Sequence, residues 1–193
     1  MGEAKRRAVA FEAAKLNLLK SLSGDELVVA QTAIRLFERF ILPKRYTGGC
    51  YLTSMILHRY LADEHGVETE VVVGYINDGT DDIFISHAWI EYAGLKTDLT
   101  IHLTEDPILR GSLIVSDGIL LTGRATYTYH RQRTQAGLLQ EMAMMKELGP
   151  LVVHKAEEHQ LMLARAANPA LMKAYLDAAP EQQGYDAMKR ALQ

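Results

Sequence analysis

The sequence predicts an α+β fold in which helices at both ends of the chain flank an antiparallel sheet. Apolar residues recur at helical spacing over residues 3–41. A middle stretch rich in Val, Ile, Thr and Tyr is interrupted by turn sequences, which is typical of short antiparallel strands. After Thr134 the helical pattern returns. We therefore expect helices, then a strand meander, then a helical C-terminal region.

Three helices are expected in the first third of the chain, over residues 3–22, 25–41 and 50–65. Pro43 should end the second helix, because proline lacks an amide N–H and disfavours helical geometry in the residue before it. Residues 44–49 then form a loop, in which Gly48 and Gly49 permit a sharp turn. Gly66 suits the left-handed conformation that commonly ends a helix, so the third helix should run from Cys50 to His65.

The sheet is expected from strands at 67–76, 83–92, 95–100 and 124–133, with a hairpin at 112–122. Turn residues at 77–82, Ala93-Gly94 and Asp117-Gly118 separate these strands. The C-terminal helices are expected at 135–148, 150–167, 169–178 and 181–192. The predicted organisation is a core with N-terminal helices over residues 1–133 and a helical region over 134–193, packed on the core or extending from it.

Composition restricts the function classes. The chain of 193 residues has 21 basic and 24 acidic residues, a net charge of −3, which gives no electrostatic reason to bind nucleic acid or an anionic membrane. No apolar run approaches the 18 residues of a membrane span. The single cysteine excludes an internal disulfide and fits a reducing compartment, so we expect a cytoplasmic protein. We expect no cofactor, and the oligomeric state stays open.

Cys50, His87 and Asp98 are the candidate catalytic residues, because they form the set used in thiolate acyl chemistry. A thiol at a helix N-terminus is favoured as the thiolate by the positive end of the helix dipole. Strand periodicity places His87 on one face of residues 83–92, and pairing with 95–100 would bring Asp98 beside it. The Cys50 amide is a natural oxyanion donor, and the second donor stays open between Tyr46 and an amide within 46–49.

The order of short motifs around these residues is more specific than any one of them. The motifs are Gly48-Gly49-Cys50-Tyr51, Gly66-Val67, Val73-Gly74-Tyr75, His87-Ala88-Trp89-Ile90-Glu91 and Asp98-Leu99-Thr100. Over about residues 46–101 the chain resembles the transglutaminase-like superfamily of papain-type cysteine enzymes. The resemblance implies a papain/transglutaminase-like core, with the helix that carries the cysteine packed on an antiparallel sheet. It also implies Cys50 as nucleophile, His87 as acid and base, and Asp98 as the group that orients the histidine.

The chain departs from that superfamily in three places. Asp98-Leu99-Thr100 stands where Asp-Pro-Thr is usual, and no tryptophan precedes Asp98. The Arg-Gly-Gly-x-Cys pattern of the arylamine acetyltransferase branch is absent, because here the glycines directly precede the cysteine. The short Cys-His-Asp module also resembles the leader-peptide proteases of lasso-peptide biosynthesis.

Three functions remain open. The first choice is a thiol-dependent hydrolase that cleaves a peptide or amide bond through an acyl-enzyme. The runner-up is an acyltransferase of the transglutaminase, deamidase or N-acyltransferase type. The third is a catalytically silent binding module of the same fold, since a lone cysteine at a helix start is more often a small buried apolar residue. No metal site is expected: His154 and His159 are five residues apart, not the four of a helical zinc pair, and a solvated charged face is expected there.

Overall fold

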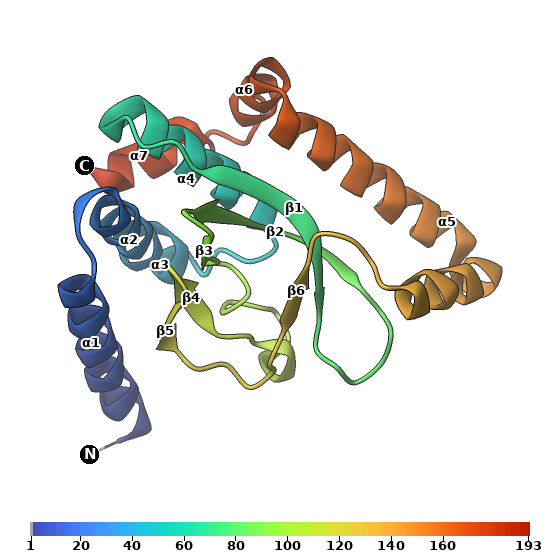
Figure 1. Ribbon diagram of the computed structural model, residues 1–193, viewed down its shortest axis with the longest axis horizontal. Coiled ribbons are helices and arrows are strands. Elements are labelled where there is room, and N and C mark those ends of the chain that lie inside the picture. Colours follow the sequence, from blue (N-terminus) through green and yellow to red (C-terminus); the bar gives the residue numbers. More distant parts are fainter. Residues whose placement is uncertain (1) are drawn as a thin grey trace.

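The structure is a computed structural model that describes residues 2–193, and it shows an α+β fold (Figure 1). The helices are α1 (Glu3–Ser21), α2 (Gly24–Leu36), the π turn η1 (Phe37–Ile41), α3 (Leu42–Lys44), α4 (Cys50–His65), the 3₁₀ turn η2 (Pro107–Leu109), α5 (Gln135–Ala167), α6 (Pro169–Asp177) and α7 (Tyr185–Leu192). The strands are β1 (Glu70–Asn77), β2 (Ile85–Tyr92), β3 (Leu95–Thr97), β4 (Leu113–Val115), β5 (Gly118–Leu121) and β6 (Thr128–His130). None of the described helices is both long and apolar enough to cross a membrane.

The main sheet is antiparallel, with strand order β3-β2-β1-β6. Strands β1 and β2 form its centre and pair from Glu70–Glu91 to Ile76–Ile85. Strands β4 and β5 form a separate hairpin, which is joined to the main sheet by backbone hydrogen bonds between Asp98 and Ile114. Asp98, the residue that follows β3, is therefore held against β4.

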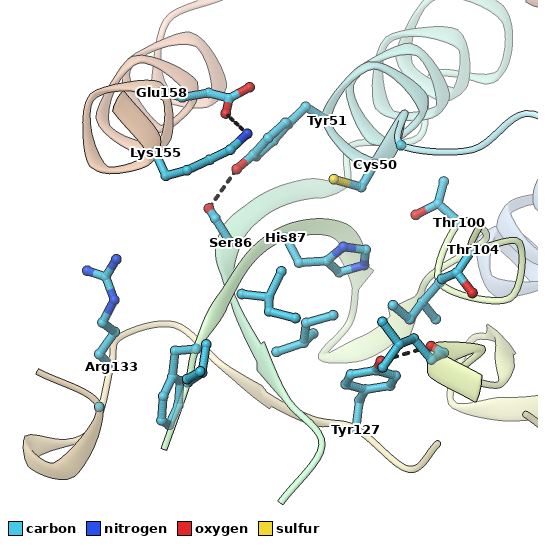
Figure 2. Close-up of a pocket in the computed structure, with 18 of the residues that line it drawn as sticks. Cys50, Tyr51, Ser86, His87, Thr100, Thr104, Tyr127, Arg133, Lys155 and Glu158 are labelled. Carbon is cyan, nitrogen blue, oxygen red and sulfur yellow. Dashed lines mark hydrogen bonds and ion pairs between the residues drawn. The ribbon is translucent and has the colours of Figure 1, made fainter. Parts of the chain in front are cut away.

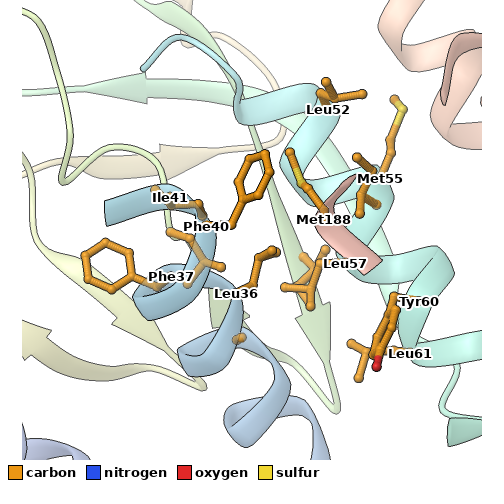
Figure 3. Close-up of a cluster of buried hydrophobic side chains, with 14 of the residues drawn as sticks. Leu36, Phe37, Phe40, Ile41, Leu52, Met55, Leu57, Tyr60, Leu61 and Met188 are labelled. Carbon is orange, nitrogen blue, oxygen red and sulfur yellow. The ribbon is translucent and has the colours of Figure 1, made fainter. Parts of the chain in front are cut away.

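The hydrophobic core lies between one face of the sheet and the helices α2, α4 and α7 (Figure 3). Phe37 and Phe40 of the π turn pack there with Met55 of α4, and all three side chains are buried. The C-terminal helices contribute to the same cluster through Leu176 and Met188. His87 and Trp89 of β2 point to the other face of the central strands, because Ala88 and Ile90 point into this core.

Helix α2 does not stop before Pro43 as expected, but continues through η1 and α3 to Lys44. In regular α-helix geometry the ring of Pro43 would clash with the carbonyl of Arg39. The π turn Phe37–Ile41 comes directly before, and its wider ring of atoms accommodates the proline. Arg45 then ends the helix in the left-handed conformation, with φ 48°.

Helix α4 begins and ends at the predicted residues. Gly66 adopts φ 66°, and its amide bonds to the Ala62 carbonyl while the Val67 amide bonds to that of Leu61. The predicted hairpin turn at Asp117-Gly118 is one residue too late, because Ser116 and Asp117 occupy the turn with φ 46° and 59°. The predicted break at Gly149-Pro150 is a kink within the single helix α5, where Leu148 leaves helical geometry with φ −121° and ψ 28°.

Gly74 is required where β1 passes between its neighbours. A Cβ atom at this position would lie 2.4 Å from the His130 carbonyl oxygen and 2.8 Å from the Trp89 ring. We expect Gly74→Ala to lower the free energy of unfolding by about 1–3 kcal/mol through overpacking, measured by urea denaturation. Gly149→Ala is the matched control: its Cβ would meet nothing within 4 Å, and we expect no loss of stability. Equal stability of the two variants would contradict this account of Gly74.

Candidate active site

Cys50 is the first residue of α4, so its amide lies in the first turn, where a helix provides no partner for N–H groups. Gly48 approaches this start with φ 70°, a conformation that a side chain would strain. The cysteine is half-buried, and its sulfur faces the imidazole of His87 (Figure 2). The predicted thiol and imidazole are therefore brought together.

His87 and Asp98 form a buried pair. The His87 Nε2 atom lies 2.6 Å from the Asp98 Oδ2 atom, and the residues are only 5% and 2% exposed. Because Nε2 is taken by the carboxylate, Nδ1 is the ring nitrogen left to interact with the Cys50 sulfur. Strand β3 is shorter than predicted, and Asp98 lies one residue beyond it. The bridge to Ile114 holds Asp98 against β4, and the hydrogen bond with His87 joins it to β2.

The Asp98 carboxylate is saturated with donors. Its Oδ1 atom accepts the Thr100 amide at 3.0 Å and the Thr100 hydroxyl at 3.2 Å. The Tyr129 hydroxyl donates to Oδ2 at 2.7 Å. The local turn formed by the Thr100 contacts also explains why β3 ends early, since the Asp98 side chain competes for the backbone. These donors hold the carboxylate in a fixed orientation toward His87.

The pair is charged in the folded protein. Burial by itself would lower the pKa of His87, but the Asp98 carboxylate and the neighbouring Cys50 side chain raise this pKa well above its ordinary value of 6.5. Burial would likewise raise the pKa of Asp98, yet His87 and the surrounding donors hold that pKa below its usual range. The geometry therefore favours an imidazolium beside the Asp98 carboxylate at neutral pH.

A second layer of contacts holds Tyr129 in place. Its ring meets that of Trp89 edge-on at a centroid distance of 5.1 Å. The Trp89 indole N–H donates to Glu91 at 2.8 Å, and Glu91 also pairs with Arg131 at 2.6 Å. A strand was expected over residues 124–133, but nothing in the sequence indicated that Tyr129 would contact Asp98. Glu91 supports the site through Trp89 and lies outside the Cys50–His87–Asp98 group.

The site opens into a cavity of about 720 Å³ that Cys50 and His87 both line. One wall comes from α5, and the opposite wall comes from the segment between Thr100 and Leu109 (Figure 2). The loop between β1 and β2 closes a further side. The C-terminal region thus forms part of the candidate site.

Three residues connect α5 to the candidate site. The Tyr51 hydroxyl is hydrogen-bonded to the Ser86 hydroxyl at 2.6 Å, and Ser86 is hydrogen-bonded to Nδ1 of His159. The His159 ring stacks on Tyr75 at a centroid distance of 4.3 Å and is 3% exposed. The expectation of a solvated face at His159 was therefore wrong. The sequence pattern could not reveal that a partner on β2 covers this side of α5.

Replacing His159 tests this connection. Burial, with Arg133 nearby, lowers the pKa of His159, so the ring is neutral at neutral pH. We expect His159→Ala to lower the free energy of unfolding by about 2–4 kcal/mol, because it removes a buried ring and a hydrogen bond. His154→Ala, on the exposed side of the same helix, should change this free energy by less than about 0.5 kcal/mol. Both variants are measured by chemical denaturation. Equal shifts of their midpoints would contradict a buried contact between His159 and β2.

No group of three His, Cys, Asp or Glu side chains within residues 2–193 is arranged to hold a metal ion. A comparison of the chain with protein-family models, with curated proteins and with solved structures finds no match.

Proposed function

We propose that this protein is a thiol-dependent hydrolase of the transglutaminase-like, papain-type class, which cleaves a peptide or amide bond through an acyl-enzyme. The observation that carries the proposal is the buried His87–Asp98 pair beside Cys50 at a helix N-terminus, with both Cys50 and His87 lining one cavity. Such a pair stabilises a thiolate in the resting protein, which is the nucleophile that acyl chemistry needs.

In the proposed reaction the Cys50 sulfur attacks the carbonyl carbon of the substrate and forms a carbon–sulfur bond, while the carbonyl oxygen takes the negative charge. The amide N–H of Cys50 donates to that oxyanion, and the Tyr46 hydroxyl is the proposed second donor. Collapse of the intermediate breaks the carbon–nitrogen bond, and His87 gives its proton to the departing amine. Water then attacks the thioester, with His87 as base, and releases the acid and the free thiol.

Acyl transfer is the alternative within the same chemistry, because an amine can replace water in the second half-reaction. The cavity extends to both sides of Cys50 and has room for a second substrate, which supports acyl transfer as the alternative function.

The experiment is to add p-nitrophenyl acetate and to follow the intact mass of the protein. We expect an acetyl group on Cys50 that disappears as water resolves it, and no adduct in Cys50→Ala. Resolution that accelerates with added putrescine would identify a transferase. A folded protein that never acquires the acetyl group would instead support the catalytically silent binding module.

A further inference from the structure

The walls of the cavity around Cys50 are largely apolar. The β1–β2 hairpin contributes Ile76, Ile83 and Phe84, and α5 contributes Met144, Leu151 and Val152. On the other side of the site Leu103 and Leu109 lie with the ring of Tyr127, whose hydroxyl donates to the Leu109 carbonyl. Such surroundings favour a ligand that carries a large apolar group.

The cavity is an open groove, since several of its apolar side chains remain in contact with solvent. Ile85 is 49% exposed, Leu109 41% and Leu151 53%. Figure 2 shows Lys155 and Glu158 on one side of Cys50 and His87, with Thr100 and Thr104 on the other. The groove therefore continues in both directions from the nucleophile, as an extended chain requires.

The charges of the groove oppose an anionic ligand. Apart from His87, the groove has two basic groups, and both are already neutralised: Arg133 pairs with Glu141 at 2.8 Å, and Lys155 pairs with Glu158 at 2.8 Å. Asp82 and Glu105 also line the groove, and within residues 2–193 neither has an ion-pair partner. A ligand with several phosphates, such as an acyl-coenzyme A, would meet uncompensated carboxylates here.

From these features we infer that the acyl donor is an extended polypeptide with a bulky apolar side chain next to the reactive carbonyl and neutral or basic residues around it. The inference rests on the proposed function and names its substrate class. A fatty acyl chain fits less well, because a single chain that ends at the carbonyl leaves the groove on the far side of Cys50 empty. The peptide covers both sides and also the exposed apolar side chains.

The test uses acetyl-dipeptidyl acyloxymethyl ketones that differ only in the side chain next to the reactive group: Phe, Ala, Lys or Glu. Inactivation rates are divided by the rate of iodoacetamide labelling of the same protein, which removes differences in thiol reactivity. We expect the Phe probe to react roughly 10- to 200-fold faster than the Ala probe, the range for apolar groups in a pocket. The Lys probe should react faster than the Glu probe.

Two variants with matched controls test whether the Phe side chain of the probe binds in the groove. Leu109→Trp and Leu151→Trp fill it from opposite walls, and at least one of them should reduce the Phe preference about tenfold or more. Ile108→Trp and Val153→Trp change neighbouring residues that are also exposed, at 67% and 41%, but that do not line the cavity. These controls should keep the wild-type preference.

Equal normalised rates for the Phe and Ala probes would overturn the inference, as would faster loading of Cys50 by palmitoyl-coenzyme A than by any peptide probe. Failure of the proposed function is a separate outcome, recognised by iodoacetamide labelling that follows an ordinary thiol. In that case the binding of fluorescent decapeptides that contain Phe or Ala to Cys50→Ser, measured by fluorescence anisotropy, still decides. Tighter binding of the Phe peptide supports the peptide site, and equal or no binding of the two peptides overturns it.

Discussion

Asp98→Asn is expected to lower the rate of Cys50 acylation by p-nitrophenyl acetate by roughly 10³- to 10⁴-fold, the scale of losing the group that orients a catalytic imidazole. The asparagine amide would turn a donor toward His87 Nε2, which now donates to Asp98 at 2.6 Å. Nε2 must then become an acceptor, so the proton moves to Nδ1 and the ring can no longer take a proton from the thiol. Asp177→Asn, which removes an exposed ion pair with Lys173, is the control and should acylate at the wild-type rate.

The same pair makes a pH-dependent contribution to stability, best measured in a Cys50→Ala background, where the Cys50 sulfur no longer contacts His87. Because Asp98 has a lowered pKa, its contribution is present above about pH 3.9 and is lost as the pH falls through its folded-state pKa. Because His87 has a raised pKa, its contribution is complete below about pH 6.5 and is lost as the pH rises through its folded-state pKa. The destabilisation by Asp98→Asn should therefore be greatest between about pH 4 and 6.5. A destabilisation that does not change from pH 4 to 9 would contradict the ion pair.

Tyr46→Phe is expected to lower the acylation rate about 10²- to 10³-fold, the range for removal of one oxyanion donor. The Tyr46 ring covers Gly49: a Cβ on that glycine would lie 2.6 Å from the phenol oxygen, which places the hydroxyl next to the start of α4. Burial, with Tyr175 and Cys50 nearby, raises the pKa of Tyr46 to about 12, so the group stays a donor at neutral pH. Within residues 2–193 no hydrogen bond of this hydroxyl is found, which leaves it available for an oxyanion.

A comparison of two reactions separates this role from a structural one. Alkylation by iodoacetamide forms no oxyanion, so its rate should be the same in Tyr46→Phe and in the wild type, while acylation falls. Parallel losses in both reactions would show that the phenylalanine only disturbs the thiol. Tyr175→Phe, which removes another hydroxyl close to Cys50, should leave acylation intact, and a loss there would move the donor to α6.

The sequence predicted those features that depend on neighbouring residues in the chain. The helix from Cys50 to His65 follows from its apolar spacing and from Gly66, and strand periodicity placed His87 so that Asp98 lies within hydrogen-bonding distance. The π turn before Pro43 was not predictable. Its buried side chains pack in the core, and this packing, which continues the helix past the proline, depends on residues far away in the sequence. The contacts of Tyr129 and His159 were missed for the same reason. Each joins elements far apart in the sequence, and composition carries no information on that pairing.

The most direct test of the central claim follows alkylation of the single cysteine by iodoacetamide from pH 5 to pH 10 in the wild type and in His87→Ala, read by intact mass. A thiolate held by the imidazolium predicts rapid labelling in the wild type well below pH 8.5, the ordinary midpoint of a free thiol. In His87→Ala the labelling should instead rise with pH like that of a free thiol. Identical profiles in the two proteins, both following an ordinary thiol, would contradict the proposed Cys50–His87–Asp98 centre.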